Sequence, residues 1–307
     1  MKLAILYAGQ GSQHPGMGKD LYERYPAFRE AFNAADLDFD LESVCFDDPE
    51  GVLNLTQYTQ PCMVAFAAGV TAVLKENGVK ADYLAGLSLG EYSALEAAGV
   101  FTAKQAVELA AFRGKAMADA AKGIECGMTA VMNLDRDALA KCCEEASVLG
   151  CVQICNYNCP GQIVISGKKA AVEEACEELK AAGAKRALML NVSGPFHSGM
   201  LAETGGKLAK VLEGVEIHTP RIPYVANVNA EFVTTAEPVK ELLTRQVSSS
   251  VRWQQSVEAM IADGVDTFIE IGPGRTLAGF MKKISREVRT LNVEKLEDID
   301  KVVEALQ

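Results

Sequence analysis

The 307-residue chain is long enough for one large domain or two of ordinary size, and 49% of its residues are hydrophobic. Its formal net charge of −11 argues against nucleic acid as a general partner, because phosphate contacts need a basic surface. No apolar run approaches the length that spans a bilayer, and the apolar start is too short for a secretory signal, so we expect a cytoplasmic protein with no membrane partner.

Short apolar runs that end in glycine-rich loops recur along the chain. They cover 2–8, 83–86 and 267–274 and predict buried parallel strands. The clearest helix lies between them at 103–121, and a Thr-x-x-Gln capping box at 102–105 opens it. Strands that alternate with helices of this length predict an α/β domain with a mainly parallel sheet.

The middle of the chain has a different order of elements. Its pattern predicts a strand, a helix, two strands around a Cys-Pro-Gly turn, a helix and a last strand, at 128–134, 135–147, 152–158, 162–167, 168–182 and 186–192. This β-α-β-β-α-β order is ferredoxin-like. We therefore predict a small subdomain over 126–193, inserted into a larger α/β domain made of 1–125 and 194–307.

The nine cysteines are an odd number in a chain without an export signal, which favours reduced thiols. Cys151, Cys155 and Cys159 are evenly spaced, as some metal ligands are. Their segment, however, is predicted as two strands around a loop, which would scatter the sulfurs over both faces. We expect no metal site.

The segment Gly86-Leu87-Ser88-Leu89-Gly90 has the pattern of a nucleophile elbow. A short apolar strand precedes it and a helix rich in Ala and Leu follows, so the Ser88 hydroxyl would stand above the sheet. The helix start favours negative charge, and the Leu89 N–H is placed to donate to an oxyanion. The alternative is a Gly-Ser loop with no chemical role, but the coincidence of strand, turn and helix favours a nucleophile.

A nucleophilic serine needs a base, and the chain offers three histidines, His14, His197 and His218. We favour His197, because it follows a Gly-Pro turn at a predicted domain crossing, where clefts form. No acidic motif presents itself as a third triad member. A backbone carbonyl would then orient the imidazole.

Two further features each allow two interpretations. The loop Gly9-Gln10-Gly11-Ser12-Gln13 lacks the lysine and spacing of a P-loop, and it is either a tight turn or the source of a second oxyanion N–H. Arg113 lies at the edge of its helix's apolar arc, where it either snorkels to water or reaches into a cleft for a carboxylate. It lies away from the charged solvent face formed by Lys104, Glu108, Lys115 and Asp119.

Together these residues resemble the malonyl-CoA:acyl carrier protein transacylase family, over essentially the whole chain. The matching motifs are GQGSQ (9–13), TQYTQP (56–61), GLSLGE (86–91), FRGKAM (112–117), NYNCPGQIVISG (156–167), GPFHSGM (194–200), RQVSSSVRW (245–253) and EIGPGRTL (270–277). The resemblance implies a hydrolase-like catalytic domain interrupted by a ferredoxin-like subdomain. It implies transfer of malonyl from malonyl-CoA to the phosphopantetheine thiol of acyl carrier protein through a malonyl-serine ester, in fatty acid biosynthesis, without a cofactor.

The resemblance also implies a role for each site residue. Ser88 would be the nucleophile and His197 the base, its ring held by the main-chain carbonyl of Gln246. The amides of Gln10 and Leu89 would form the oxyanion hole.

On the substrate side, the resemblance implies that Arg113 pairs with the malonyl carboxylate. It implies that Phe196 leaves no room for an α-methyl group and that Asn156 binds substrate. Many members have His where this chain has Leu87, which removes a hydrogen bond beside the nucleophile.

Two rival functions fit parts of the sequence. GLSLGE also occurs in editing acyl hydrolases, although these tend to lose the arginine that is kept here as Arg113. A non-catalytic carrier-docking module would keep the fold without turnover. We expect the enzyme to be a monomer. Its carrier protein would serve either fatty acid or polyketide synthesis. The carrier would dock on the basic run from Arg275 to Arg289.

Overall fold

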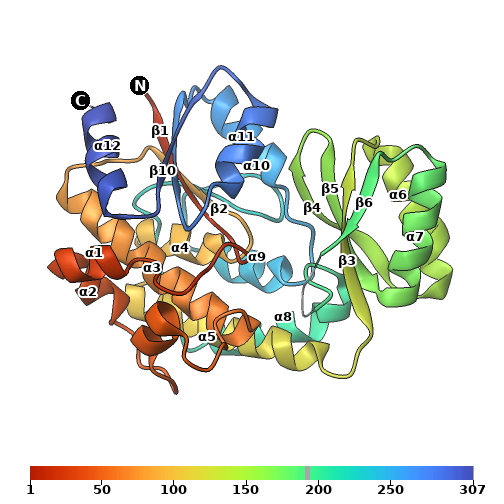
Figure 1. The fold of residues 1–307 in the computed structure, drawn as a ribbon, viewed down its shortest axis with the longest axis horizontal. Helices are drawn as coiled ribbons and strands as arrows, with labels where there is room; N and C mark the ends of the chain where they lie inside the picture. The colour runs from red at the N-terminus through yellow and green to blue at the C-terminus, as the bar shows by residue number, and fades with distance from the viewer. Residues whose placement is uncertain (191–193, 307) are drawn as a thin grey trace.

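The computed structural model describes residues 1–190 and 194–306, which fold around two separate sheets (Figure 1). The larger sheet has the order β10-β9-β1-β2-β7-β8, and its pairs are parallel except for β7 with β8. Its strands are β1 (Leu3–Tyr7), β2 (Tyr83–Gly86), β7 (Tyr224–Val225), β8 (Phe232–Val233), β9 (Thr267–Ile271) and β10 (Arg289–Val293).

Helices cover both faces of this sheet. Strand β1 is buried throughout, and its side chains alternate: Leu3, Ile5 and Tyr7 pack on one face, Ala4 and Leu6 on the other. The helices are α1 (Lys19–Arg24), α2 (Pro26–Phe32), α3 (Thr56–Glu76), α4 (Gly90–Ala97), α5 (Ala103–Ala121), α8 (Ala202–Leu212), α9 (Val239–Gln246), α10 (Trp253–Ala262), α11 (Thr276–Ile284) and α12 (Leu296–Leu306). The capping box predicted at the start of α5 is confirmed, since Thr102 and Gln105 bond reciprocally.

The smaller sheet is antiparallel and has the order β4-β5-β3-β6, as in ferredoxin-like folds. Its elements are β3 (Cys126–Met132), α6 (Arg136–Ala146), β4 (Val152–Cys159), β5 (Gln162–Lys168), α7 (Lys169–Ala181) and β6 (Arg186–Met189). The predicted α/β fold class is confirmed. The strand predicted at 186–192 is β6, which ends at Met189. Residues 191–193, which include the end of that predicted strand and the predicted last residue of the subdomain, lie outside the described residues.

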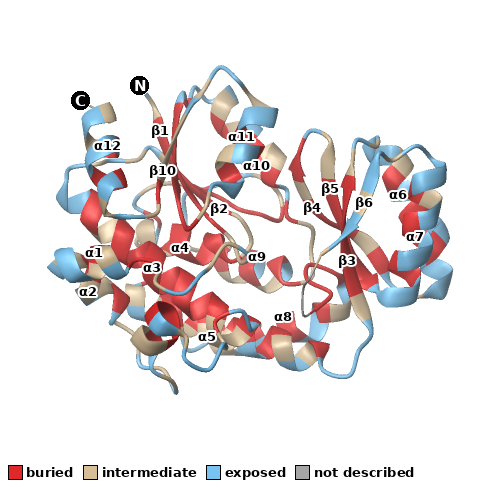
Figure 2. Ribbon diagram, in the orientation of Figure 1, coloured by how far each residue is buried: buried red, intermediate tan, exposed pale blue. Residues whose placement is uncertain are grey.

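Burial differs between the two parts of the molecule (Figure 2). Helix α3 is buried along most of its length, whereas α6 and α7 each expose an outer face. Along residues 1–190 and 194–306, no helix combines the length and the apolar character that crossing a membrane requires.

Main-chain hydrogen bonds join the two sheets at Val251. Its N–H donates to the carbonyl of Cys155 at 2.8 Å, and its own carbonyl accepts from the N–H of Tyr157 at 2.9 Å. Val251 therefore extends the edge of β4 just before α10 begins. The next residue, Arg252, donates its N–H to the carbonyl of Asn227 at 2.8 Å, at the end of β7.

Strands β1, β2, β7 and β9 run in the same direction, so their carboxyl ends meet at one edge of the larger sheet. Open α/β sheets bind ligands at this edge. The loops that leave it carry Gln10, Ser88, Asn227 and the Gly-Pro-Gly segment before α11. The predicted nucleophile therefore lies where such folds place their chemistry.

Candidate active site

Ser88 occupies a sharp turn between β2 and α4. Its backbone is left-handed, with φ of 53°, which is strained for a residue other than glycine. A Cβ on Gly86 would lie 1.9 Å from the carbonyl oxygen of Gly90, and one on Gly90 would lie 2.2 Å from that of Tyr7. Both flanking glycines are therefore required for the chain to turn and hold the hydroxyl above the sheet.

His197 lies against Ser88. Its Nε2 is 2.6 Å from Ser88 Oγ, and its Nδ1 is 2.8 Å from the main-chain oxygen of Gln246. Because a carbonyl can only accept, Nδ1 carries the ring proton and Nε2 is free to accept the proton of Ser88. Burial, and secondly the positive charge of Arg113, lower the pKa of His197 to about 4, so the ring is neutral at pH 7 and able to act as a base.

The other two histidines lie elsewhere. His14 contacts Glu294 at 3.1 Å on the surface, and His218 lies 3.8 Å from Glu216. Neither lines the cavity that contains Ser88. Of the three histidines, the structure brings only His197 to the nucleophile.

Arg113 points inward from α5 and is 1% exposed, so of the two interpretations the structure favours the cleft. Its Nη1 donates to Gln60 Oε1 at 2.9 Å, and its Nη2 donates to Ser88 Oγ at 3.2 Å and to Gln246 Oε1 at 3.1 Å. These partners are neutral oxygens, and Nε–H has no hydrogen-bond partner among the described residues. The buried guanidinium thus lies beside the nucleophile with donor capacity left for an anion.

The loop after β1 packs against the elbow. A Cβ on Gly9 would lie 2.7 Å from the carbonyl oxygen of Leu87, so only glycine permits this approach. Within the described part of the chain, the N–H groups of Gln10 and Leu89 have no hydrogen-bond partner, although both residues line the cavity beside Ser88. Free amides at this position can receive an oxyanion.

A cavity of about 690 Å³ joins these residues, and its walls are loops and helices around the larger sheet on one side and strands of the smaller sheet on the other. Phe196 and Asn156 line it, as do Met128 of β3 and Val164 of β5. Thr276 and Phe280 of α11 lie on its wall as well. The cavity is large enough for a thioester arm. All the predicted site residues line it except Gln246, which contacts His197 and Arg113 without lining the cavity.

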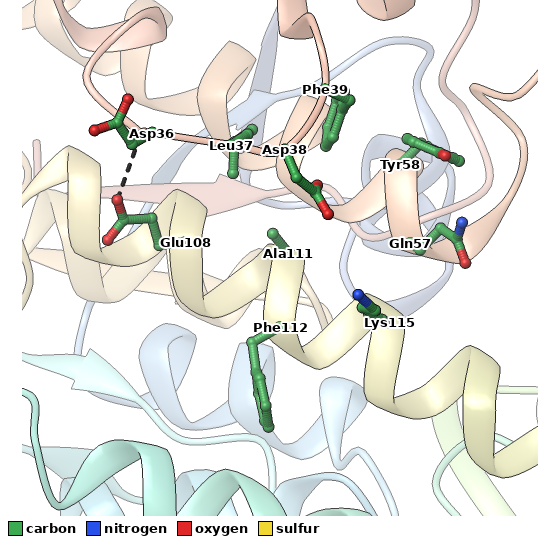
Figure 3. A pocket seen from close by; sticks show the side chains of 10 residues that line it. All are labelled: Asp36, Leu37, Asp38, Phe39, Gln57, Tyr58, Glu108, Ala111, Phe112 and Lys115. Atoms are coloured by element: carbon green, nitrogen blue, oxygen red, sulfur yellow. Dashed lines mark hydrogen bonds between the residues drawn. The ribbon is translucent and has the colours of Figure 1, made fainter.

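A second hollow, of about 280 Å³, lies on the outer side of α5 (Figure 3). It is lined by Glu108 and Lys115, which the helical pattern assigned to the solvent face, and Glu108 accepts a hydrogen bond from the N–H of Asp36 at 3.3 Å. None of the predicted site residues lines it. Helix α5 therefore separates this hollow from the reactive cavity that Arg113 faces.

Three residues of the site were not singled out from the sequence. Gln60 supports Arg113, and Asn227 accepts the Ser88 N–H through Oδ1 at 2.7 Å while its Nδ2 donates to the Gly86 carbonyl at 2.7 Å. Glu91 is fully buried below the elbow. Asn227 could have been identified from the sequence, because it follows a short apolar run, as polar residues at the carboxyl ends of parallel strands do.

The geometry agrees with the comparisons. The acyl transferase domain family matches residues 5–299. The malonyl CoA-acyl carrier protein transacylase of Bacillus subtilis is 43% identical over 309 residues, covering 100% of this chain and 98% of the relative. The crystal structure of the Clostridium perfringens malonyl CoA-acyl carrier protein transacylase is 42% identical, with a TM-score of 0.96 over 100% of this chain and 97% of that one.

A third comparison involves a complex. A malonyl-transacylase solved together with its type II PKS acyl-carrier protein is 39% identical, with a TM-score of 0.95 over 99% of this chain and 100% of that one. The family match, the full-length identity and the fold all agree. This chain belongs to the malonyl CoA-acyl carrier protein transacylase family.

Proposed function

We propose that this enzyme transfers malonyl from malonyl-CoA to the phosphopantetheine thiol of acyl carrier protein, through an ester on Ser88, and so supplies fatty acid biosynthesis. One observation carries the proposal: a serine paired with a neutral histidine shares its cavity with a buried arginine that forms no ion pair with any acidic residue in the described part of the chain. The pair supplies acyl transfer, and the arginine selects an acyl group that ends in a carboxylate.

In the first half-reaction, His197 Nε2 takes the proton of Ser88 as Oγ attacks the thioester carbon. The amides of Gln10 and Leu89 hold the negative oxygen that forms. The carbon–sulfur bond then breaks, and CoA leaves as a thiol with the proton from His197.

The second half-reaction reverses these roles. The carrier thiol gives its proton to His197, and its sulfur attacks the carbonyl carbon of the malonyl-Ser88 ester. The carbon–oxygen bond breaks and Ser88 recovers its proton. The Gln246 carbonyl keeps the imidazole in the same tautomer throughout, since it accepts from Nδ1 in both halves.

Incubation with radiolabelled malonyl-CoA tests this function. We expect one malonyl group per chain, stable on the enzyme until carrier protein is added and then found on the carrier. Rapid release of free malonate would instead identify an acyl hydrolase. No labelling of the folded chain would identify a docking module without turnover.

The carrier is proposed to dock on α11 and the loop that follows it. Lys282, Lys283 and Arg286 are exposed, and none forms an ion pair with a described residue. The same helix places Thr276 and Phe280 on the cavity wall. A basic patch beside the cavity would attract an acidic carrier to a chain that is itself acidic.

Reversing these three charges to Glu is expected to slow transfer to carrier protein by roughly 10-fold or more and to weaken its salt dependence. Transfer to free pantetheine should change little, because Ser88 is untouched. As a control of equal charge change, Lys19, Lys75 and Lys104, which lie away from the reactive cavity, are replaced by Glu. Equal losses in both triple variants would place docking elsewhere.

Every residue proposed for the reaction belongs to one chain, so the proposal requires only a monomer. It also places the enzyme in the cytoplasm, and the nine cysteines, all among the described residues, are free thiols as a reducing compartment would keep them.

A further inference from the structure

Glu91 is a buried carboxylate for which the reaction above has no use. It is the second residue of α4, three positions after the nucleophile, and it is 0% exposed. Its Oε2 accepts from Gln246 Nε2 at 2.7 Å and from the main-chain N–H of Asn227 at 3.3 Å, while Oε1 has no hydrogen-bond partner among the described residues. Burial of such a group is costly, so its retention directly below Ser88 calls for a reason.

The two ends of the Gln246 side-chain amide have different partners: acceptors surround its nitrogen, and a donor faces its oxygen. Its Nε2 donates to Glu91 and to the Ser88 carbonyl at 2.9 Å, and its Oε1 accepts from Arg113 Nη2 at 3.1 Å. A flipped amide would turn its NH₂ group toward the guanidinium, donor against donor, and its oxygen toward a carboxylate. Glu91 and Arg113 therefore both oppose the flipped orientation, one from each end of the amide. Without Glu91, the Nε2 end would be held only by one weaker, neutral bond to the Ser88 carbonyl.

Gln246 and Asn227 connect this carboxylate with the reacting groups. Gln246 also offers its main-chain oxygen to His197 Nδ1. Asn227, held by Glu91 through its N–H, fixes the amide of Ser88 with its own side chain. One carboxylate thus contacts the two residues that orient the nucleophile, the base and the arginine.

On this geometry, and on the function proposed above, we propose that Glu91 is a positioning residue that fixes the Gln246 amide so that Arg113 presents its donors to the malonyl carboxylate. Among the described residues, the hydrogen bonds of the Glu91 side chain go to Gln246 and Asn227 and not to Ser88 Oγ or the His197 ring, so it would act through Gln246. The part of Gln246 that Glu91 holds is the side-chain amide, which contacts Arg113, whereas His197 is held by the main-chain carbonyl of Gln246. The effect of Glu91 should therefore fall on the selection of malonyl more than on the reactivity of Ser88.

The charge of Glu91 changes near neutral pH, and its carboxylate form is the stronger acceptor for Gln246 Nε2. Burial raises the pKa of Glu91 to about 7, while the hydrogen bonds from Gln246 and Asn227 and the charge of Arg113 oppose the rise. The other titratable groups facing it are Tyr92 on α4 and Tyr224 on β7, both with pKa values raised by burial and both neutral. Arg113 on α5 is the nearby positive charge that favours the carboxylate form.

The test compares Glu91→Ala with Glu91→Gln, using two acyl donors that load Ser88. Malonyl-CoA needs Arg113, whereas p-nitrophenyl acetate has no carboxylate and reports the Ser88–His197 pair alone. We expect Glu91→Ala to lower kcat/KM for malonyl-CoA roughly 10- to 100-fold more than for p-nitrophenyl acetate. Glu91→Gln, whose amide oxygen can occupy the Oε2 position, should recover most of the selectivity.

A double-mutant cycle with Gln246→Leu tests whether Glu91 acts through Gln246. In the Gln246→Leu background, Glu91→Ala should change selectivity by less than about 2-fold, because the amide that it positions is gone. Thermal unfolding of each variant identifies any that fail to fold, and Glu91→Gln then serves in place of Glu91→Ala. With Glu91→Gln alone, malonyl selectivity a few-fold below that of the parent above pH 7 and equal to it below pH 7 supports the proposal, because protonated Glu91 and the amide are both neutral acceptors. Parental selectivity of Glu91→Gln at every pH would overturn it.

Equal losses with both donors, or full additivity in the cycle, would overturn the positioning role. So would Glu91→Ala with the selectivity of the parent. These outcomes are distinct from failure of the proposed function, since in that case the parent itself would not form a malonyl ester on Ser88.

Discussion

Replacing Ser88 by Ala is expected to abolish the covalent malonyl-enzyme and to lower transfer by on the order of 10⁶-fold, as loss of an activated serine does in other acyl-transfer enzymes. The change removes only the hydroxyl group, whose oxygen lies 2.6 Å from His197 Nε2. Intact-mass spectrometry after incubation with malonyl-CoA measures the adduct.

The fold should survive this change. Ser88 Oγ projects into the cavity, and the strained backbone of the turn is as accessible to Ala as to Ser. Ser12→Ala is the matched control, because it removes a hydroxyl from the neighbouring glycine-rich loop and should leave the adduct intact. A malonyl adduct that persists on a folded Ser88→Ala variant would assign the nucleophile to another residue.

The second large effect concerns substrate choice. Arg113→Ala is expected to lower malonyl transfer far more than acylation by a donor without a carboxylate. Hydrogen bonds to charged groups contribute roughly 1.5–3 kcal/mol, or about 10- to 150-fold, and sites built around a polar partner discriminate by up to ~10⁴. The ratio of kcat/KM values for malonyl-CoA and p-nitrophenyl acetate is the measurement.

Two further variants distinguish the charge of Arg113 from its planar geometry as the cause of the lost malonyl selectivity. Arg113→Lys keeps the charge without the planar fork, so it should recover only part of the selectivity. Lys115→Ala, two residues along α5 and facing the outer hollow of Figure 3, removes a charge without touching the cavity and should behave as the parent does. Proportional losses with both donors in Arg113→Ala would give Arg113 a purely structural role.

The features that the sequence predicted well are local. The strand, glycines, serine and helix start of the elbow lie within about ten consecutive residues, and each has a steric reason that can be read from the chain. The same holds for the capping box of α5 and for the β-α-β-β-α-β order. In these segments, neighbouring residues alone determine the conformation.

The surroundings of Arg113 could not be predicted in this way. Helical periodicity gives the direction in which the side chain leaves α5, but its partners Gln60 and Gln246 are 53 and 133 positions away. Asn227 meets Ser88 across 139 positions. Such contacts depend on which strands become neighbours in the sheet, which no local pattern specifies.

The bridge at Val251 has a consequence for the range of acyl groups that the enzyme accepts. One wall of the cavity is the smaller sheet and the other is formed by loops and helices around the larger sheet, and main-chain bonds of 2.8 and 2.9 Å join β4 to Val251 between them. Widening the cavity as a whole would require breaking backbone pairing, whereas a side chain on the wall needs only to rotate or be replaced. We therefore expect wall residues such as Phe196 and Met117, rather than the separation of the two walls, to set the size limit for an acyl group. Variants that accept bulkier acyl groups should arise by shortening those side chains, and loosening the joint between the sheets would cost stability without gaining breadth.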